Sequence, residues 1–366
     1  MPPGNLIVLK PFRVLEVAVH CIFCGKPPES RTKEHIYPQW LLKMTGFHSK
    51  DTSVGTNWTT GKEIIFHGKN YTFPACDICN NKFSGLEARV KGIIERLSED
   101  ESVSGEELEI LLDWFDKLRA GTWLGISYMN KSVFSLPPNH YINDRVGVKD
   151  RYLSITNTYL PEKTLKWSGA NSLTFMSSPT ALMVRINNLV FVSASTDFLV
   201  AHSVGFPYAQ FEAVTPGSNI AHWELAQGTR EVLSGCFDHV PYSPSYTLRQ
   251  PIFKGAFESN PAFYDNSHVA AHSHDMSAGI GKLFLQKGDV STVLNRDTEV
   301  NFAMENAKSV FGQVLVVRPI LELQLEMLTS RLRKLVFVNE AEKQKQILAA
   351  REIVEYTKEQ IRQYRY

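Results

Sequence analysis

Apolar residues recur at helical spacing in three parts of the chain. The first part, 80–97, predicts a helix whose apolar stripe is formed by Phe83, Leu86, Val90, Ile93, Ile94 and Leu97. The second predicts a helix over 106–130 that opens on acidic residues, which suit the positive end of the helix dipole. From Pro319 onwards, leucines three and four residues apart predict helix to the end of the chain, with a break at Asn339.

Shorter apolar runs, bounded by turn residues, predict strands. They lie at 6–9, 14–19, 184–186, 189–193 and 314–317. Asn187 and Asn188, between two of these runs, favour a hairpin, and an inserted hairpin or loop containing Trp58, Phe66 and His67 is expected within 44–70. Helices and strands together predict the α+β class.

Changes of pattern along the 366 residues suggest four regions. These are a first domain over 1–97, a polar linker and connecting helix over 98–130, a mixed α+β domain of unknown role over 131–318, and C-terminal helices over 319–366. The last helices are consistent with a coiled coil that joins two copies or binds a protein partner, or with a helical hairpin packed on its own domain.

Composition and charge narrow the class of protein. A hydrophobic content of 43% excludes a disordered chain, and 39 basic against 38 acidic residues excludes a polybasic one. The first 97 residues nevertheless hold 13 basic and 8 acidic residues. No apolar run is long enough to span a membrane, and the start lacks the features of a secretory signal, so a cytoplasmic protein without a membrane partner is expected.

Four of the five cysteines form two Cys-x-x-Cys pairs, Cys21 with Cys24 and Cys76 with Cys79. A disulfide framework would need more cysteines and an exported chain. Two such pairs in a cytoplasmic chain predict one structural zinc ion bound by four thiolates, with redox-active pairs as the alternative. Cys236 stands alone and is expected to be a small buried apolar residue.

Candidate chemistry lies between and after these pairs. The segment 33–38 has the sequence Lys-Glu-His-Ile-Tyr-Pro, and the second pair continues as Cys-Asp-Ile-Cys-Asn. In this order, the motifs resemble the HNH endonucleases, whose ββα-metal core often carries a four-cysteine zinc site. The resemblance covers about 18–97, and it implies an N-terminal ββα-metal domain of the HNH or His-Me finger type, followed by the larger α+β region.

The resemblance also implies a role for each matching residue. His35 would be the general base, because a neutral imidazole accepts a proton near neutral pH. Glu34 and Asn80 would bind a catalytic Mg²⁺ or Mn²⁺ through oxygen atoms, and Asn70 would hold the intervening loop. Lys33, Lys82 and Arg89 would contact the nucleic-acid backbone. The 51 residues between Cys24 and Cys76, the Glu at the metal position and the terminal Asn depart from the commonest pattern.

The resemblance therefore predicts a metal-dependent endonuclease that hydrolyses phosphodiester bonds, with DNA as the favoured substrate and anti-phage defence as a possible setting. The alternative is a zinc-ribbon-like module that binds nucleic acid or protein without catalysis. A third reading is a nuclease held inactive until residues 131–366 bind a trigger. A separate group of His268, His272, His274 and Asp275 is expected to be a solvated loop, with a transition-metal site as the alternative.

Overall fold

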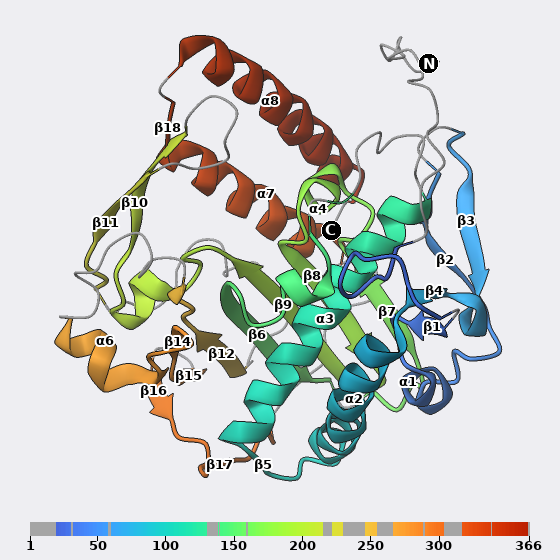
Figure 1. The fold of residues 1–366 in the computed structure, drawn as a ribbon. Helices are drawn as coiled ribbons and strands as arrows, with labels where there is room; N and C mark the ends of the chain where they lie inside the picture. Colours follow the sequence, from blue (N-terminus) through green and yellow to red (C-terminus); the bar gives the residue numbers. More distant parts are fainter. Residues whose placement is uncertain are drawn as a thin grey trace.

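A computed structural model describes most of the chain and contains both helices and sheets, which confirms the α+β class (Figure 1). The described residues are 20–30, 32–57, 60–129, 138, 140–158, 160–214, 222–229, 246–254, 266–287, 290–303, 317–337 and 339–364. The strands predicted at 6–9 and 14–19, Trp58 and Cys236 lie outside them.

The first domain is built on two antiparallel strands followed by a long helix. Strand β1 (Thr32–His35) pairs with β4 (Thr72–Ala75), and α2 (Asp77–Ser98) follows. The inserted segment between the strands forms the predicted hairpin. Its elements are α1 (Gln39–Met44), β2 (Asp51–Thr56), β3 (Glu63–His67) and the 3-10 turn η1 (Gly68–Asn70).

The predicted connecting helix is a central element of the core. Helix α3 (Gly105–Met129) follows a two-residue strand, β5 (Val103–Ser104), that pairs with β17 (Glu299–Val300). Nineteen of its residues are buried, and apolar positions on all of its sides are typical of a helix enclosed by the protein. One hydrophobic cluster runs from the first domain through α3 into the large sheet, so 98–130 is not a linker between separate cores.

The largest sheet has seven antiparallel strands in the order β16-β15-β12-β6-β9-β8-β7. The predicted hairpin is β8 and β9, and Asn187 in its turn has a φ of 53°, which asparagine tolerates better than most residues. The strands are β6 (Asp150–Asn157), β7 (Leu165–Ser168), β8 (Ala181–Ile186), β9 (Leu189–Thr196), β12 (Tyr246–Gln250), β15 (Leu283–Lys287) and β16 (Val290–Leu294).

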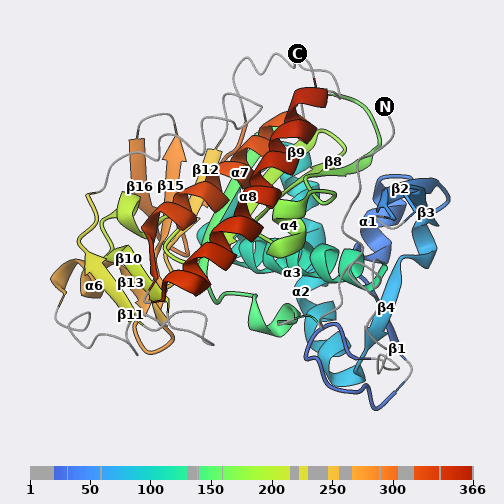
Figure 2. The ribbon, with the colours of Figure 1, turned by 90° about the horizontal axis from the view of Figure 1, so that it is seen from above.

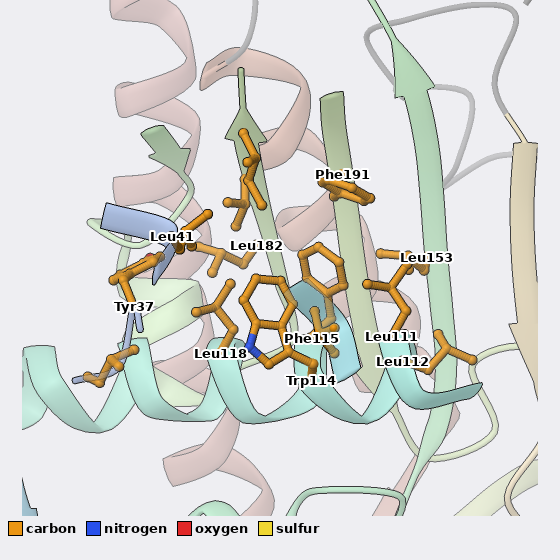
Figure 3. Close-up of a cluster of buried hydrophobic side chains, with 14 of the residues drawn as sticks. Tyr37, Leu41, Leu111, Leu112, Trp114, Phe115, Leu118, Leu153, Leu182 and Phe191 are labelled. Atoms are coloured by element: carbon orange, nitrogen blue, oxygen red, sulfur yellow. The ribbon is translucent and has the colours of Figure 1, made fainter. Parts of the chain in front are cut away.

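Alternating side chains of this sheet face two different helices. Leu182 and Phe191 pack on the α3 side, where the rings of Phe115 and Phe191 lie 4.8 Å apart (Figure 3). Met183 and Val192, the next residues on the same strands, pack against α7 (Val317–Lys334) on the other side. Because strand side chains alternate between faces, apolar residues at nearly every position are required for a sheet covered on both sides.

The C-terminal helices pack on their own domain. Helix α7 buries Ile320, Leu323 and Met327 against the sheet, and α8 (Glu340–Gln363) lies along α7, as Figure 2 shows. The break predicted at Asn339 is confirmed. Leu335, however, belongs to a short strand β18 (Leu335–Phe337) and not to the helix, and Val317 opens α7 instead of ending a strand.

The remaining elements include a small three-stranded sheet. Strand β10 pairs antiparallel with β11 and parallel with β18. These elements are η2 (Ile142–Asp144), α4 (Leu173–Ser177), η3 (Ala201–Val204), β10 (Tyr208–Val214), β11 (His222–Ala226), α6 (Ser267–His272), β13 (Ser273–Asp275) and β14 (Ile280–Gly281). No helix in the described part of the chain is long and apolar enough to cross a membrane.

Two glycines on α3 let the first domain approach it closely. A Cβ added to Gly125 would lie 2.5 Å from the hydroxyl of Tyr71, and one added to Gly121 would lie 3.2 Å from the Ile36 side chain. The two glycines are one helical turn apart and therefore share a face. Ile36 directly follows β1, so this contact fixes the end of β1 against the buried helix.

A buried carboxylate joins three segments around the sheet. Asp150 accepts hydrogen bonds from the backbone N–H groups of Val200, Ala201 and Ile252 at 2.7–2.9 Å. In Asp150→Asn, one of the two acceptor oxygens is replaced by a donor, which leaves at least one buried N–H unpaired. We expect the variant to lose about 2 kcal/mol of unfolding free energy in chemical denaturation. Unchanged stability would show that water satisfies these groups.

Candidate active site and metal centre

The four paired cysteines meet at one place, where the first domain turns from strand to helix. Cys21 and Cys24 lie in a tight turn in which the N–H of Gly25 donates to the carbonyl of Cys21 at 2.9 Å. Gly25 has a φ of 71°, a conformation that favours glycine. Cys76 follows β4 directly, and Cys79 lies in the first turn of α2. The turn and the start of the helix therefore bring their thiols together.

The geometry of this cluster fits zinc. All four sulfur atoms lie within 4.8 Å of one another, and the Sγ atoms of Cys24 and Cys76 are 3.9 Å apart. A tetrahedral ion with bonds of about 2.3 Å separates its sulfur ligands by about 3.8 Å. The N–H of Cys76 also lies 3.3 Å from the Sγ of Cys21, as a donor that stabilises a thiolate. The arrangement supports the predicted structural zinc site.

Zinc binding would have to change the protonation of the thiols. Burial, together with the neighbouring cysteines, raises the pKa of Cys76 to about 11 and that of Cys79 to about 12. Burial acts on Cys21 too, but backbone N–H donors outweigh it and lower its pKa. Without a metal ion the thiols of Cys76 and Cys79 keep their protons near neutral pH, and a bound zinc ion would supply the positive charge that four neighbouring thiolates need. Zinc would then fix the turn at Cys21 and Cys24 to the start of α2.

His35 lies at the end of β1, on the more exposed side of the strand. Its Nε2 atom is 3.1 Å from the backbone carbonyl of Lys69, in η1, and 2.6 Å from the side-chain amide of Gln39. His35 pairs in register with Thr72 at the start of β4. The ring is therefore held by the inserted segment on one side and by α1 on the other.

Two contacts of Nε2 bear on which ring nitrogen carries the proton, and as placed they conflict: the carbonyl of Lys69 needs a proton on Nε2, whereas the amide nitrogen of Gln39, at 2.6 Å, donates to a lone pair there. A carbonyl oxygen only accepts, so the hydrogen bond requires a proton on Nε2. The amide of Gln39 is compatible with this tautomer when its oxygen, not its nitrogen, faces the ring; a half-turn exchanges the two ends. The lone pair is then on Nδ1, for which the described residues provide no hydrogen-bond partner. A neutral His35 held in this way has a nitrogen available to accept a proton.

Glu34 faces the opposite side of β1 and is buried. Adjacent residues of a strand point to opposite faces, so Glu34 and His35 do not form the expected side-by-side pair. The carboxylate of Glu34 lies 2.5 Å from Nζ of Lys117 on α3, and the same ammonium also pairs with Glu87 on α2. Burial alone would lower the pKa of Lys117, but these carboxylates outweigh it and raise that pKa.

These contacts leave no ready site for the predicted catalytic ion. The charge of Glu34 is compensated by an ammonium group, and its carboxylate is directed away from the ring of His35. Within the part of the chain that the structure describes, the four cysteines are the only group of three or more His, Cys, Asp or Glu side chains within ligand distance. The residues present therefore do not fit a preformed Mg²⁺ or Mn²⁺ site at Glu34.

The two asparagines to which the resemblance gives a role lie in the first turn of α2 and at the end of η1. Asn80 is half-buried in the first turn of α2, where its N–H donates to the carbonyl of Cys76 at 2.9 Å. Asn80 and Glu87 are seven residues apart and share a face of that helix. Asn70 is exposed and ends η1, next to the carbonyl that contacts His35. The ligand role of Asn80 stays a prediction.

The three predicted backbone-binding residues differ in their surroundings. Lys33 is exposed on β1, two residues before His35 and on the same face. Lys82 is exposed on α2 with its ammonium 5.7 Å from the ring of Phe83. Arg89 pairs with Glu106 at 2.9 Å, so its charge is partly compensated. Lys33 is thus the best placed of the three to contact a substrate at His35.

Sequence reasoning missed the residues that hold His35 and Glu34. Gln39 and the carbonyl of Lys69 carry no motif, and the latter is a backbone group that any residue could supply. Lys117 had a detectable signal, because it lies in a helix with apolar residues on all sides. A charge enclosed in such a helix requires a partner of opposite charge, and Glu34 and Glu87 are those partners.

The separate histidine group is not a metal site in this arrangement. His268 and His272 stack with their ring centres 4.1 Å apart on α6. Nε2 of His268 contacts the carbonyl of Val204, and Nδ1 of His272 contacts the carbonyl of His268, both at 3.0 Å. The two histidines belong to a helix, and not to the solvated loop that was expected.

Comparisons of the chain with protein-family models, curated proteins and solved structures gave no match. The resemblance to HNH endonucleases therefore depends on the motifs at 33–38 and 76–80 alone.

Proposed function

We propose that this chain is an HNH-type endonuclease that hydrolyses phosphodiester bonds, with DNA as the favoured substrate. The observation that carries the proposal is the placement of His35, whose Nε2 lies 3.1 Å from the carbonyl of Lys69; with the Gln39 amide turned so that its oxygen faces the ring, both groups accept from Nε2–H and Nδ1 is available as a base. Two antiparallel strands followed by a helix, with cysteines at their junction, are the arrangement that the resemblance implies.

In the proposed reaction, Nδ1 of His35 accepts a proton from a water molecule, and the resulting hydroxide attacks the phosphorus atom. The bond from phosphorus to the leaving oxygen breaks, and that oxygen takes a proton from solvent. Lys33 and Lys69 are exposed near the ring, and their positive charges favour phosphate binding on this face. The zinc ion would fix the frame through Cys21, Cys24, Cys76 and Cys79. Glu34 is not assigned as a ligand of a divalent ion, because it is committed to Lys117; a Mg²⁺ or Mn²⁺ ion that supports cleavage would bind without it.

The direct test is a cleavage assay with the zinc-loaded full chain. Plasmid DNA, linear double-stranded DNA, single-stranded DNA and RNA are incubated with Mg²⁺, with Mn²⁺ and with a chelator that leaves the zinc bound. We expect endonucleolytic cuts in DNA, which convert supercoiled plasmid to open circles. The same substrates stay intact with the His35→Ala protein. Intact substrates with the wild-type protein under every condition would contradict the proposal.

One observation favours a second function, a zinc module that binds nucleic acid or protein without catalysis. Glu34 is neutralised by Lys117, and the cysteines are the only cluster with metal-ligand geometry in the described residues. Such a module would bind one zinc ion and would retain nucleic-acid binding in the His35→Ala variant. Gel-shift measurements on the same substrates separate the two functions, because the module binds and does not cut.

A further inference from the structure

Three charged residues from distant parts of the sequence meet where α3 packs on the first domain. Lys117 is 1% exposed at its side chain, and its Nζ pairs with Glu34, which is 7% exposed, and with Glu87, which is 15% exposed. The residues belong to β1, α2 and α3. The ammonium also lies 5.8 Å from the ring of Phe23, between the first two cysteines. One lysine therefore pairs with β1 and α2 of the ββα unit and lies beside the turn that carries Cys21 and Cys24.

Burying this group is costly, so its presence needs an explanation. Removing two carboxylates and an ammonium from water costs several kcal/mol per ion before their attraction repays it, and apolar residues of similar volume often give equal stability. The group also carries two negative charges for one positive charge. What it supplies, and an apolar core does not, is a fixed geometry, because each charge is stable only beside its partner.

We propose that Lys117 is a positioning residue for the nuclease site, and that Glu34 orients β1 instead of binding a catalytic ion; this inference rests on the proposed function. With the Glu34 side chain fixed inward, the next residue of the strand must face outward. That residue is His35, whose ring then meets the carbonyl of Lys69. Glu87 holds Lys117 from the side of α2.

The two roles considered for Glu34, metal ligand and positioning residue for β1, predict different effects of replacing Lys117. If Glu34 bound a divalent ion, the ammonium 2.5 Å away would compete with that ion, and its removal would strengthen metal binding. If Glu34 positions β1, removal of the charge of Glu34 or of Lys117 releases the strand, and the two changes slow the reaction to a similar extent. The dependence of cleavage on Mn²⁺ concentration therefore distinguishes the roles.

The experiment compares Lys117→Met and Glu34→Gln with the wild-type protein in two independent measurements. The first is hydrogen exchange of the peptide that contains β1, followed by mass spectrometry. The second is cleavage kinetics at varied Mn²⁺. In the exchange measurement, we expect faster exchange in β1 and unchanged exchange in β8 and β9. In the kinetic measurement, we expect kcat to fall about 10- to 100-fold in both variants while KM stays within about twofold. The Mn²⁺ concentration that gives half-maximal rate should not change.

Lys91→Met is the matched control, because Lys91 is a half-exposed lysine on α2 that pairs only with Glu95 on the same helix. It should leave exchange and kinetics unchanged. If Lys117→Met does not fold, the near-isosteric triple variant Glu34→Gln, Glu87→Gln, Lys117→Met removes every charge at once, and it should fold, bind zinc and show the same loss of kcat.

Two results would overturn the inference. One is exchange in β1 that stays at the wild-type rate when Lys117 is replaced. The other is a rise in the Mn²⁺ requirement for Glu34→Gln together with a fall for Lys117→Met, which would make Glu34 a metal ligand. If the wild-type protein cleaves no substrate, the proposed function fails, and the exchange measurement alone decides whether Lys117 positions β1.

Discussion

Replacing Cys79 with serine will release zinc and unfold the first domain. Structural zinc sites contribute about 10–16 kcal/mol of apparent binding free energy near neutral pH, which exceeds the whole stability of many domains. Cys79 is one of the four predicted ligands that would join the Cys21–Cys24 turn to α2, and no other Cys, His, Asp or Glu side chain of the described residues completes the set. Loss of one thiolate therefore leaves the turn and the helix unconnected.

The measurement is zinc content by elemental mass spectrometry, with thermal unfolding of the same samples. Wild-type protein should contain one zinc ion per chain, and Cys79→Ser should contain almost none and unfold at a clearly lower temperature. Because the first domain shares a hydrophobic cluster with α3, part of this loss should extend to the large sheet. Cys236→Ser, outside both pairs, is the control and should retain its zinc. One zinc ion per chain in Cys79→Ser would exclude the four-cysteine site.

Replacing His35 with alanine should reduce cleavage by about 10²- to 10⁴-fold, the usual contribution of a general base. The hydrogen bonds of the ring to the described residues are with Gln39 and the carbonyl of Lys69, and the ring is not part of the buried core. The variant should therefore keep its zinc ion and its unfolding temperature. Cleavage rates on the best substrate of the wild-type protein provide the measurement.

His48→Ala is a suitable control for this variant. His48 follows the same helix α1 that carries Gln39, and its removal takes an imidazole from the same domain without touching β1. It should cleave at nearly the wild-type rate. Equal rates for His35→Ala and wild-type protein, with zinc bound in both, would remove His35 from the mechanism.

Local patterns predicted much of the fold. Apolar stripes located α2 and α3 to within a few residues, and two asparagines located the turn between β8 and β9. These elements follow from the spacing of side chains along a short segment, which is visible in the sequence. The order of the seven strands, by contrast, depends on pairings between residues as distant as Leu153 and Leu248, for which no local signal exists.

The site was predicted in part. The spacing of the cysteines indicated one zinc site, and all four lie within ligand distance. The roles of Glu34 and His35 were taken from the resemblance, but adjacent residues in a strand face opposite sides, so the strand separates the two side chains. The partner of Glu34 is Lys117, 83 residues away, and only the packing of α3 on β1 brings them together.

The most direct test of the account is the tautomer of His35 in the zinc-loaded protein. Nitrogen-15 spectra of histidine-labelled protein near neutral pH distinguish a protonated ring nitrogen from one with a free lone pair. The His35 signals are assigned by their absence from His35→Ala. The account predicts a proton on Nε2, facing the carbonyl of Lys69, and none on Nδ1. A proton on Nδ1 with a bare Nε2 would contradict it, since the nitrogen proposed as the base would then have no lone pair to offer.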